Sequence, residues 1–571
     1  MARVLPEHAV YLPGEAIRIF VESEVEGTLQ LKRREEVIAS WSIKQGAQVV
    51  EATAEGIGVY EAVLEPAKTH SSFAVLEPLD RPPALAVVFH NHQAPNFSPD
   101  GAVREPWAYA HVWNDEFSPY YRGGAYLVQA RLLKKWGLAW NVNLSPSLLA
   151  QWASLLERGA VINLDGSYLC VEPGSSQAGM IAETLQTFKE LAGSQLEVLT
   201  SFYSHPLAGY IAENYGWLDL LREELRLGKQ ITSQVLGVEP KGVWLPEMSF
   251  SMKLVSLMLE QGIRFTVLDA LHHFAGAVGE KGGIYEPYEL EGLVVFFRHT
   301  GLSDLWSFKY SNVETPSEAE AAAVDFALRL VLEAYVNRAR PLTLALDGEN
   351  WMILPKPKPA AAVFFDRFLA QLKWAVSRGI VKLVKLSDAA EAFEPKRLAG
   401  IPARSWMGSY DKWTSEKRSE QERIWSNVVE AYEIHKALEN SVGVGSEELL
   451  ALMHAVNSDH MWAEFADEGF SREWLEYLRS KLLAVLHSIK LEGFSGGKLK
   501  VRNTLGKNVK VVVRENGQMR DVQLQPGVNE IRIQGNVVEI ALQGWSKTFR
   551  VGKPLVKAHA TDKSLEGKGD R

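Results

Sequence analysis

The sequence predicts an α/β protein: a seven-stranded (β/α)7 TIM-like barrel, then an α-helical bundle, with a β-sandwich domain at each end. Three observations carry this prediction. Seven short apolar runs, most of them separated by helix-length segments, recur between residues 85 and 347, which is typical of parallel strands buried on both faces. Amphipathic helical periodicity replaces this rhythm after about residue 395. Alternating apolar and polar segments, separated by turn residues, occupy both ends of the chain.

The length of 571 residues exceeds what one hydrophobic core normally serves, so we expect several domains. Arg81-Pro82-Pro83 forms a stiff boundary after the first alternating segments. The expected domains are an N-terminal β-sandwich at 1–80, the barrel at 81–395, a helical bundle completing the cleft at 396–492, a C-terminal β-sandwich at 493–552 and a disordered tail at 553–571.

Composition excludes several classes of partner. The net charge is −9, and we find no long basic stripe, so neither nucleic acid nor an anionic membrane is an expected partner. The single cysteine, Cys170, excludes an intrachain disulfide and a cysteine-rich zinc module. We find no signal-like N-terminus and no apolar run long enough to cross a bilayer, so we expect a cytoplasmic protein. The sequence leaves the oligomeric state open.

Polar residues close several of the seven apolar runs. In a parallel barrel the carboxyl ends of the strands converge on one mouth, where active sites are built. The runs are 85–90, 138–143, 196–200, 243–247, 265–269, 293–298 and 342–347. The polar residues are His90 with His92 and Gln93, Asn143, Glu197 within its strand, Glu247, Asp269, Arg298 with His299, and Asp347.

Glu247 and Asp347 are the candidate catalytic pair. Glu247 ends a short apolar run beside Trp244, where a carboxylate is costly to desolvate and needs a charged partner or a chemical role. Two carboxyl groups about 5 to 5.5 Å apart are what retaining glycoside hydrolysis requires. A strand-end salt bridge for Glu247 and a simple turn at Asp347-Gly348 are the structural alternatives.

His90 and His92 have two interpretations. At positions i and i+2 of an extended segment they share a face, so they could ligate zinc or bind sugar hydroxyls. Asp115, Asp269 or His299 could supply a third ligand, but the spacing matches no known zinc motif. We therefore expect no metal and no other cofactor.

Further residues are candidates for substrate binding. Arg298 could keep Glu247 ionised, or could instead form a salt bridge between strands. A subset of the 17 tryptophans, among them Trp244, Trp351 and Trp462, would suit a cleft that stacks sugar rings. The others are His205, His299, Glu349, Asp459 and His460, for several of which a purely structural role is the alternative.

The C-terminal part predicts helices and then a hairpin. Ile424, Trp425 and Val428 share one helical face, and a second amphipathic helix follows Ser471, its expected N-cap. Between them lies the polar insert Asn457-Ser458-Asp459-His460, which we expect to face the barrel mouth. Asn516-Gly517, flanked by alternating runs, predicts a β-hairpin.

Five stretches of the sequence resemble glycoside hydrolase family 57, a family of retaining α-glucan enzymes. They are His92-Gln93-Ala94-Pro95, residues 193–206 with Glu197 and His205, residues 242–247, Leu346-Asp347-Gly348-Glu349-Asn350, and residues 455–462. The resemblance implies an incomplete seven-stranded barrel followed by a helical region over roughly residues 84–490. It also implies that Glu247 is the nucleophile and Asp347 the acid/base.

Within the family, residues 297–304 and the Asp-Gly-Glu-Asn form of the fourth motif are most similar to the amylopullulanase and α-amylase branch. We therefore predict a retaining hydrolase of α-1,4 bonds, with α-1,6 bonds left open, in starch-like α-glucan or maltooligosaccharide. A 4-α-glucanotransferase or branching enzyme of the same family is the competing enzyme, because acceptor choice depends on the outer subsites. A non-catalytic carbohydrate-binding protein and a zinc-dependent deacetylase are the rivals from other classes.

Overall fold

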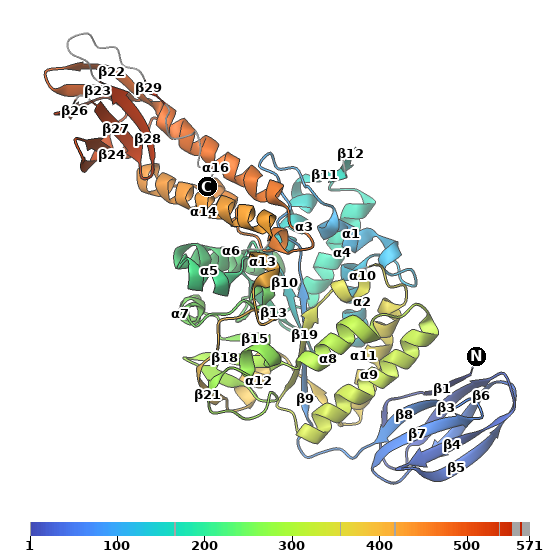
Figure 1. The fold of residues 1–571 in the computed structure, drawn as a ribbon. Helices are drawn as coiled ribbons and strands as arrows, with labels where there is room; N and C mark the ends of the chain where they lie inside the picture. Colours follow the sequence, from blue (N-terminus) through green and yellow to red (C-terminus); the bar gives the residue numbers. More distant parts are fainter. Residues whose placement is uncertain are drawn as a thin grey trace. The chain divides into compact units, whose positions relative to one another are not determined.

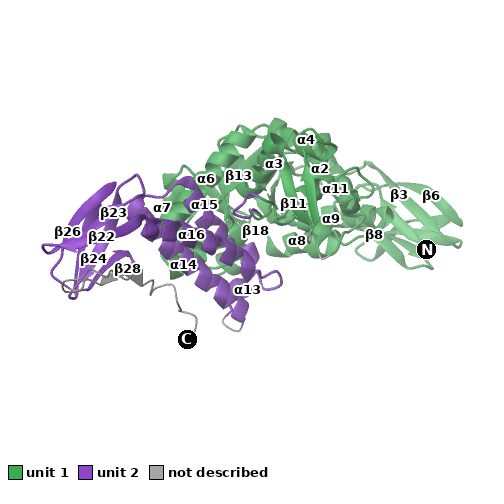
Figure 2. Cartoon of the chain, turned by 90° about the horizontal axis from the view of Figure 1, so that it is seen from above, with its two compact units in different colours: residues 1–96, 102–410 green, residues 97–101, 411–571 purple. Residues whose placement is uncertain are grey.

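The structure is a computed structural model that describes residues 2–164, 167–354, 356–415, 418–535, 537–550 and 560–561. The chain divides into two compact units, residues 1–96 with 102–410 and residues 97–101 with 411–571 (Figure 2). Apart from Ala560 and Thr561, the tail predicted at 553–571 lies outside the described residues.

A β-sandwich begins the first unit. Strand β3 alternates between exposed and buried residues, so that Ile17, Ile19 and Val21 enter the sandwich core. One sheet has the order β1 (Arg3–Pro6), β3 (Ala16–Ser23) and β6 (Gly46–Thr53), and the other β2 (Val10–Tyr11), β8 (Thr69–Val75), β7 (Gly58–Glu65), β4 (Gly27–Arg33) and β5 (Glu36–Ile43).

The seven apolar runs form the seven strands of a closed parallel barrel, as predicted (Figure 1). All eight residues of β9 are buried, because helices cover the outside and side chains fill the inside. The spatial order is β15 (Phe265–Asp269), β14 (Gly242–Trp244), β13 (Leu196–Ser201), β10 (Trp140–Leu144), β9 (Ala84–Asn91), β19 (Leu342–Asp347) and β18 (Leu293–Arg298), and β18 pairs with β15 to close the ring.

Helices follow most barrel strands and start and stop at recognisable residues. Helix α9 begins with a capping box between Thr315 and Glu318, and Gly137 ends α2 in the left-handed conformation. The longer helices are α1 (Trp107–Trp113), α2 (Ala125–Trp136), α3 (Pro146–Arg158), α4 (Ser176–Leu191), α5 (Ala208–Asn214), α6 (Leu218–Leu236), α7 (Lys253–Glu260), α9 (Pro316–Asn337), α11 (Ala361–Ser377) and α12 (Leu386–Ala392).

Short elements occupy the loops of the first unit. They are the helical turns η1 (Asp115–Phe117), η2 (Pro246–Met248), η3 (Ala270–Phe274), α8 (Thr300–Leu305), η4 (Trp306–Tyr310) and α10 (Asn350–Ile353), and the strands β11 (Ala160–Leu164), β12 (Ser167–Val171), β16 (Val278–Gly279), β17 (Tyr288–Leu290), β20 (Lys382–Leu383) and β21 (Lys396–Gly400).

The second unit contains the predicted helices. They are α13 (Asp411–Thr414), α14 (Ser419–Val442), α15 (Ser446–Ala455), η5 (Asp459–Met461) and α16 (Glu468–Ser488). The N-cap expected at Ser471 is wrong: α16 begins one turn earlier, where the side chain of Asp467 accepts a hydrogen bond from the Phe470 N–H. Asp467 is an equally strong cap, so the sequence offered two starts.

After helix α16 the second unit consists of β-strands. Asn516 and Gly517 both have positive φ and turn β24 into β25, which confirms the predicted hairpin. The two sheets have the orders β22 (Ile489–Ser495), β23 (Lys498–Asn503), β26 (Gly527–Arg532) and β25 (Gln518–Leu524), β24 (Val509–Glu515), β27 (Val537–Leu542), β28 (Trp545–Arg550), β29 (Ala560–Thr561). In the part of the chain described here, none of the helices combines the length and apolarity needed to cross a membrane.

Candidate active site

Because the seven barrel strands are parallel, their carboxyl ends meet at one mouth. His90, Trp244, Arg298 and Asp347 stand at or next to the ends of their strands. The loops that follow carry His92, Gln93, His205, Glu247, His299 and Glu349.

Glu247 lies in the tight turn after β14. Its φ is 55° and that of the next residue, Met248, is 47°, a conformation that costs a residue with a side chain about 1 to 3 kcal/mol. The Glu247 side chain is 18% exposed. Its Oε2 accepts a hydrogen bond from Trp406 Nε1 at 2.8 Å, and its Oε1 lies 4.0 Å from His205 Nδ1. The turn thus holds a partly buried carboxylate with a defined neighbour at each oxygen.

Trp406 is a site residue that sequence reasoning missed. Its backbone N–H also donates to the Glu247 carbonyl at 3.0 Å, and the guanidinium carbon of Arg298 lies 5.9 Å from its ring centroid. Arg298 thus lies against the indole whose N–H donates to Glu247. A tryptophan two residues before Gly408, outside any helical periodicity, was the available signal for a loop aromatic.

Three histidines and a tryptophan form a stack beside Glu247. The His90 ring lies 4.7 Å from Trp244 at an interplanar angle of 9°, and the His92 ring lies 3.8 Å from His205 at 15°. His90 Nε2 and His205 Nε2 are 3.2 Å apart, within hydrogen-bond distance. His90, His205 and Trp244 are buried, and His92 is the partly exposed member of the stack.

The same three histidines lie close enough together to be considered as metal ligands. One ligand atom from each of His90, His92 and His205 lies within 4.8 Å of the others, so the third candidate is His205 rather than Asp115, Asp269 or His299. Imidazole lone pairs lie in the ring plane, and these planes are within 9° to 15° of parallel. Their lone pairs do not converge on one point, as a tetrahedral zinc site needs. The arrangement fits a hydrogen-bonded stack better than a zinc site.

Asp347 ends β19 directly opposite His90 in the register with β9. The strand is buried up to Leu346, whereas Asp347 is exposed and accepts a hydrogen bond from Asn350 Nδ2 at 3.0 Å. A Cβ on the next residue, Gly348, would lie 2.0 Å from Asn91 Oδ1, so a larger residue would have to displace the buried Asn91 side chain, which is hydrogen-bonded to Gln129. An exposed carboxylate is thereby fixed next to the histidine stack.

Glu349 lies behind Asp347 and is 1% exposed. Burial, and next the charge of Asp347, raise the pKa of Glu349 well above its usual value. Gln93 Nε2 lies 3.5 Å from the Tyr126 hydroxyl, which donates to the His92 carbonyl at 2.9 Å. Gln93 and Tyr126 thus support the segment that carries His92.

Other predicted site residues have structural contacts instead. Arg298 Nε donates to Asp269 Oδ2 at 2.7 Å, the salt bridge between strands that was the alternative. His299 caps α8 by accepting from the Leu302 N–H. Glu197, the second residue of β13, accepts a hydrogen bond from Ser387 and is not brought to the mouth. Trp351 is 2% exposed and packs against Trp306, Phe89 and Phe365.

Asp459, His460 and Trp462 belong to the second unit. Asp459 and His460 form the short helix η5, where His460 stacks on Phe470 at 3.7 Å. The Trp462 ring meets Trp413 edge to face at 4.9 Å. These contacts account for the local positions of His460 and Trp462.

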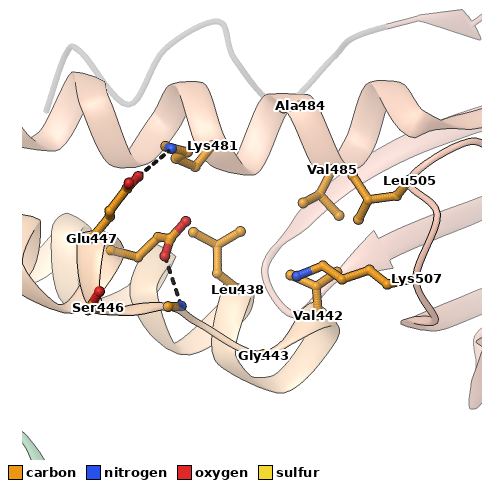
Figure 3. A pocket seen from close by; sticks show the side chains of 12 residues that line it. Leu438, Val442, Gly443, Ser446, Glu447, Lys481, Ala484, Val485, Leu505 and Lys507 are labelled. Atoms are coloured by element: carbon orange, nitrogen blue, oxygen red, sulfur yellow. Dashed lines mark hydrogen bonds and ion pairs between the residues drawn. The ribbon is translucent and has the colours of Figure 1, made fainter.

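A cavity of about 460 Å³ lies within the second unit (Figure 3). Its apolar side includes Leu438, Val485 and Leu505, and Lys481 pairs with Glu447 at its rim. None of the residues lining it is aromatic, and the barrel-mouth residues take no part in it. We therefore do not assign the chemistry to this cavity.

Comparison with known proteins identifies the family. A family model described as glycosyl hydrolase family 57 matches residues 86–403, more than half of the chain. The barrel, with two carboxylates at its mouth, is thus that of a glycosidase family, and the chain belongs to glycosyl hydrolase family 57. A search of curated proteins found no match.

One solved structure supports the fold, and two more are reported beside it for comparison. The branching enzyme of this family from Thermococcus kodakaraensis is 15% identical, with a TM-score of 0.52 over 71% of this chain and 90% of its own. The 4-α-glucanotransferase from Thermococcus litoralis is 16% identical (TM-score 0.48, 77% and 63% covered), and the α-amylase AmyC from Thermotoga maritima is 13% identical (0.48, 71% and 92%). At these identities the specific activity is not resolved.

Proposed function

We propose that this protein is a retaining glycosidase that cleaves α-1,4 bonds of starch-like glucans or maltooligosaccharides. Glu247 attacks the anomeric carbon and forms a glycosyl-enzyme, while the Asp347 carboxyl protonates the departing oxygen. Asp347 then takes a proton from water, which attacks the same carbon and releases the sugar with its original configuration.

One observation carries the proposal: Glu247, in a strained turn, is connected through His205 and His90 to the strand position opposite Asp347. A carboxylate nucleophile must stay ionised and keep a fixed orientation. The Trp406 indole N–H donates to Glu247 Oε2, which stabilises the charged form and holds the side chain in place. Asp347 is the exposed carboxylate on the other side of the stack, where a leaving oxygen can reach it. Membership of a glycosidase family supports the same reaction class.

Product analysis on maltooligosaccharides and pullulan tests the proposal, with Glu247→Gln and Asp347→Asn beside the wild type. Each variant is expected to lose at least about 1,000-fold in turnover, because each removes a group that acts on the reacting atoms. Glu223→Gln on the exposed face of α6 is the matched control and should keep full activity.

Near wild-type turnover in either variant on glucans with unactivated leaving groups contradicts the assignment. The products also report the reaction: redistribution of chain lengths without new reducing ends identifies a glucanotransferase, and new α-1,6 branches identify a branching enzyme. Cleavage of pullulan at its α-1,6 bonds extends the proposed specificity.

A further inference from the structure

Asn143 lies behind the histidine stack and has no part in the mechanism above. It is fully buried on β10, paired in register with His90 on β9 and with Leu199 on β13. A buried amide on a barrel strand must have all its polar atoms satisfied, so its partners reveal its role.

The hydrogen bonds of Asn143 fix the orientation of its amide. Nδ2 donates to the Leu199 carbonyl at 2.9 Å, and a carbonyl can only accept. Oδ1 therefore faces His90, whose Nδ1 lies 2.7 Å away. Because Oδ1 can only accept, the His90 Nδ1 must carry a proton.

That proton determines the next hydrogen bond along the stack. A neutral His90 protonated at Nδ1 has its lone pair at Nε2, which lies 3.2 Å from His205 Nε2. His205 must then donate from Nε2. The other His205 nitrogen, Nδ1, is the one 4.0 Å from Glu247 Oε1. One buried amide thus places a proton on His90 Nδ1 and one on His205 Nε2, in the ring next to the carboxylate.

We propose that Asn143 is a positioning residue for the reaction: its amide sets the tautomers of His90 and His205, and through them the charge distribution facing Glu247. The expected effect on catalysis rests on the proposed function. The assignment of the tautomers rests on the hydrogen bonds alone. Titratable groups of the first unit that face His90 include His92 and His205, and Asp347 lies opposite it in register.

Asn141 provides a matched control on the same strand. It is also fully buried and, two positions earlier, shares a strand face with Asn143. Among the described residues its side chain bonds only backbone groups, donating to the carbonyls of Val87 and Val384 and accepting from the Leu386 N–H. Asn141→Leu therefore removes three hydrogen bonds, against two for Asn143→Leu, and none of the three involves a histidine.

The first arm of the test reads the tautomers directly. In ¹⁵N-histidine NMR of the full chain we expect a neutral ring protonated at Nδ1, assigned to His90 by its loss in His90→Gln. Asn143→Leu should convert it to the Nε2-protonated form, and Asn141→Leu should leave it unchanged. A wild-type His90 protonated only at Nε2, or an unchanged signal in Asn143→Leu, overturns the proposal.

The second arm reads catalysis. Asn143→Leu is expected to lower kcat/KM on maltooligosaccharides about 10- to 100-fold and to shift its pH profile. Asn143→Asp still accepts the Nδ1 proton, so it should restore the tautomer while its charge moves the profile to higher pH. Asn141→Leu should lower Tm without moving the pH profile, and an equal shift in that control overturns the proposal.

A wild type that is inactive on every α-glucan refutes the proposed function. The NMR experiment still decides whether Asn143 sets the tautomers.

Discussion

At Glu247 the two carboxylate oxygens have different neighbours, an indole N–H at Oε2 and an imidazole near Oε1. The sequence predicted the carboxylate because it ends an apolar run beside a tryptophan. It could not predict Trp406, which lies 159 positions later in a loop without periodicity. Single tryptophans in loops are more often core residues, and Trp351, a predicted sugar platform, proved to be one.

Trp406→Phe removes the N–H but keeps an aromatic ring. We expect kcat/KM to fall about 10- to 100-fold, because a hydrogen bond to a charged group is lost. The acidic limb of the pH profile should move to higher pH, since the ionised carboxylate loses a donor. Trp374→Phe is the control, because its indole donates at the same 2.8 Å to the Val10 carbonyl, far from the mouth. An unchanged profile in Trp406→Phe would show that the bond has no catalytic role.

Glu224 supports the loop that carries His205. It is fully buried, and its carboxyl oxygens accept from the Ser204 N–H at 2.8 Å and the Ser204 hydroxyl at 2.5 Å. Burial raises the pKa of Glu224 to about 8, against an ordinary value of 4.5. Between these values the folded chain binds more protons than the unfolded chain, so stability is lost as pH rises from about 4.5 through 8.

Glu224→Gln keeps an acceptor for the Ser204 N–H but does not titrate. The Tm difference between the variant and the wild type should therefore change in favour of the variant as pH rises through about 8. Thermal unfolding followed from pH 5 to pH 9 measures this difference. A Tm difference that stays constant with pH would show that Glu224 does not titrate in this way.

At the scale of elements, the barrel closes through side chains as well as strands. Strand β18 pairs with β15 over five residues but with β19 only at Arg298 and Thr343. Arg298 strengthens both seams, donating from Nε to Asp269 at the end of β15 and from Nη1 to the Ala345 carbonyl of β19. The apolar runs predicted all seven strands, because burial on both faces leaves a strong signal. They could not predict how the ring closes.

Arg298→Met should therefore destabilise the barrel by about 3 to 5 kcal/mol, because it leaves the buried Asp269 without its cation. Adding Asp269→Asn should recover part of the loss, since no charge then stays buried. Urea unfolding of the two single variants and the double variant measures the coupling. Strictly additive losses would mean that the two side chains stabilise the fold independently.

At the scale of the molecule, the first unit joins a sandwich to the barrel through α11. The Trp374 ring stacks on His8 at 3.4 Å, and Gln371 Nε2 donates to the Glu7 carbonyl at 3.0 Å. The sequence predicted both parts from their periodicities. It gave no sign of this junction, because the contacts join residues more than 360 positions apart. The family was predictable because its motifs are local stretches of chain, each with its own residue pattern.

The central claim is that Glu247 forms a covalent bond to the sugar. Mass spectrometry after reaction with a 5-fluoro-α-glucosyl fluoride, which slows release of the glycosyl-enzyme, tests this directly. We predict a mass increase of one sugar, located by peptide mapping on Glu247 and absent from Glu247→Gln. A label on Asp347 or elsewhere, or a product released with inverted anomeric configuration, would contradict the account.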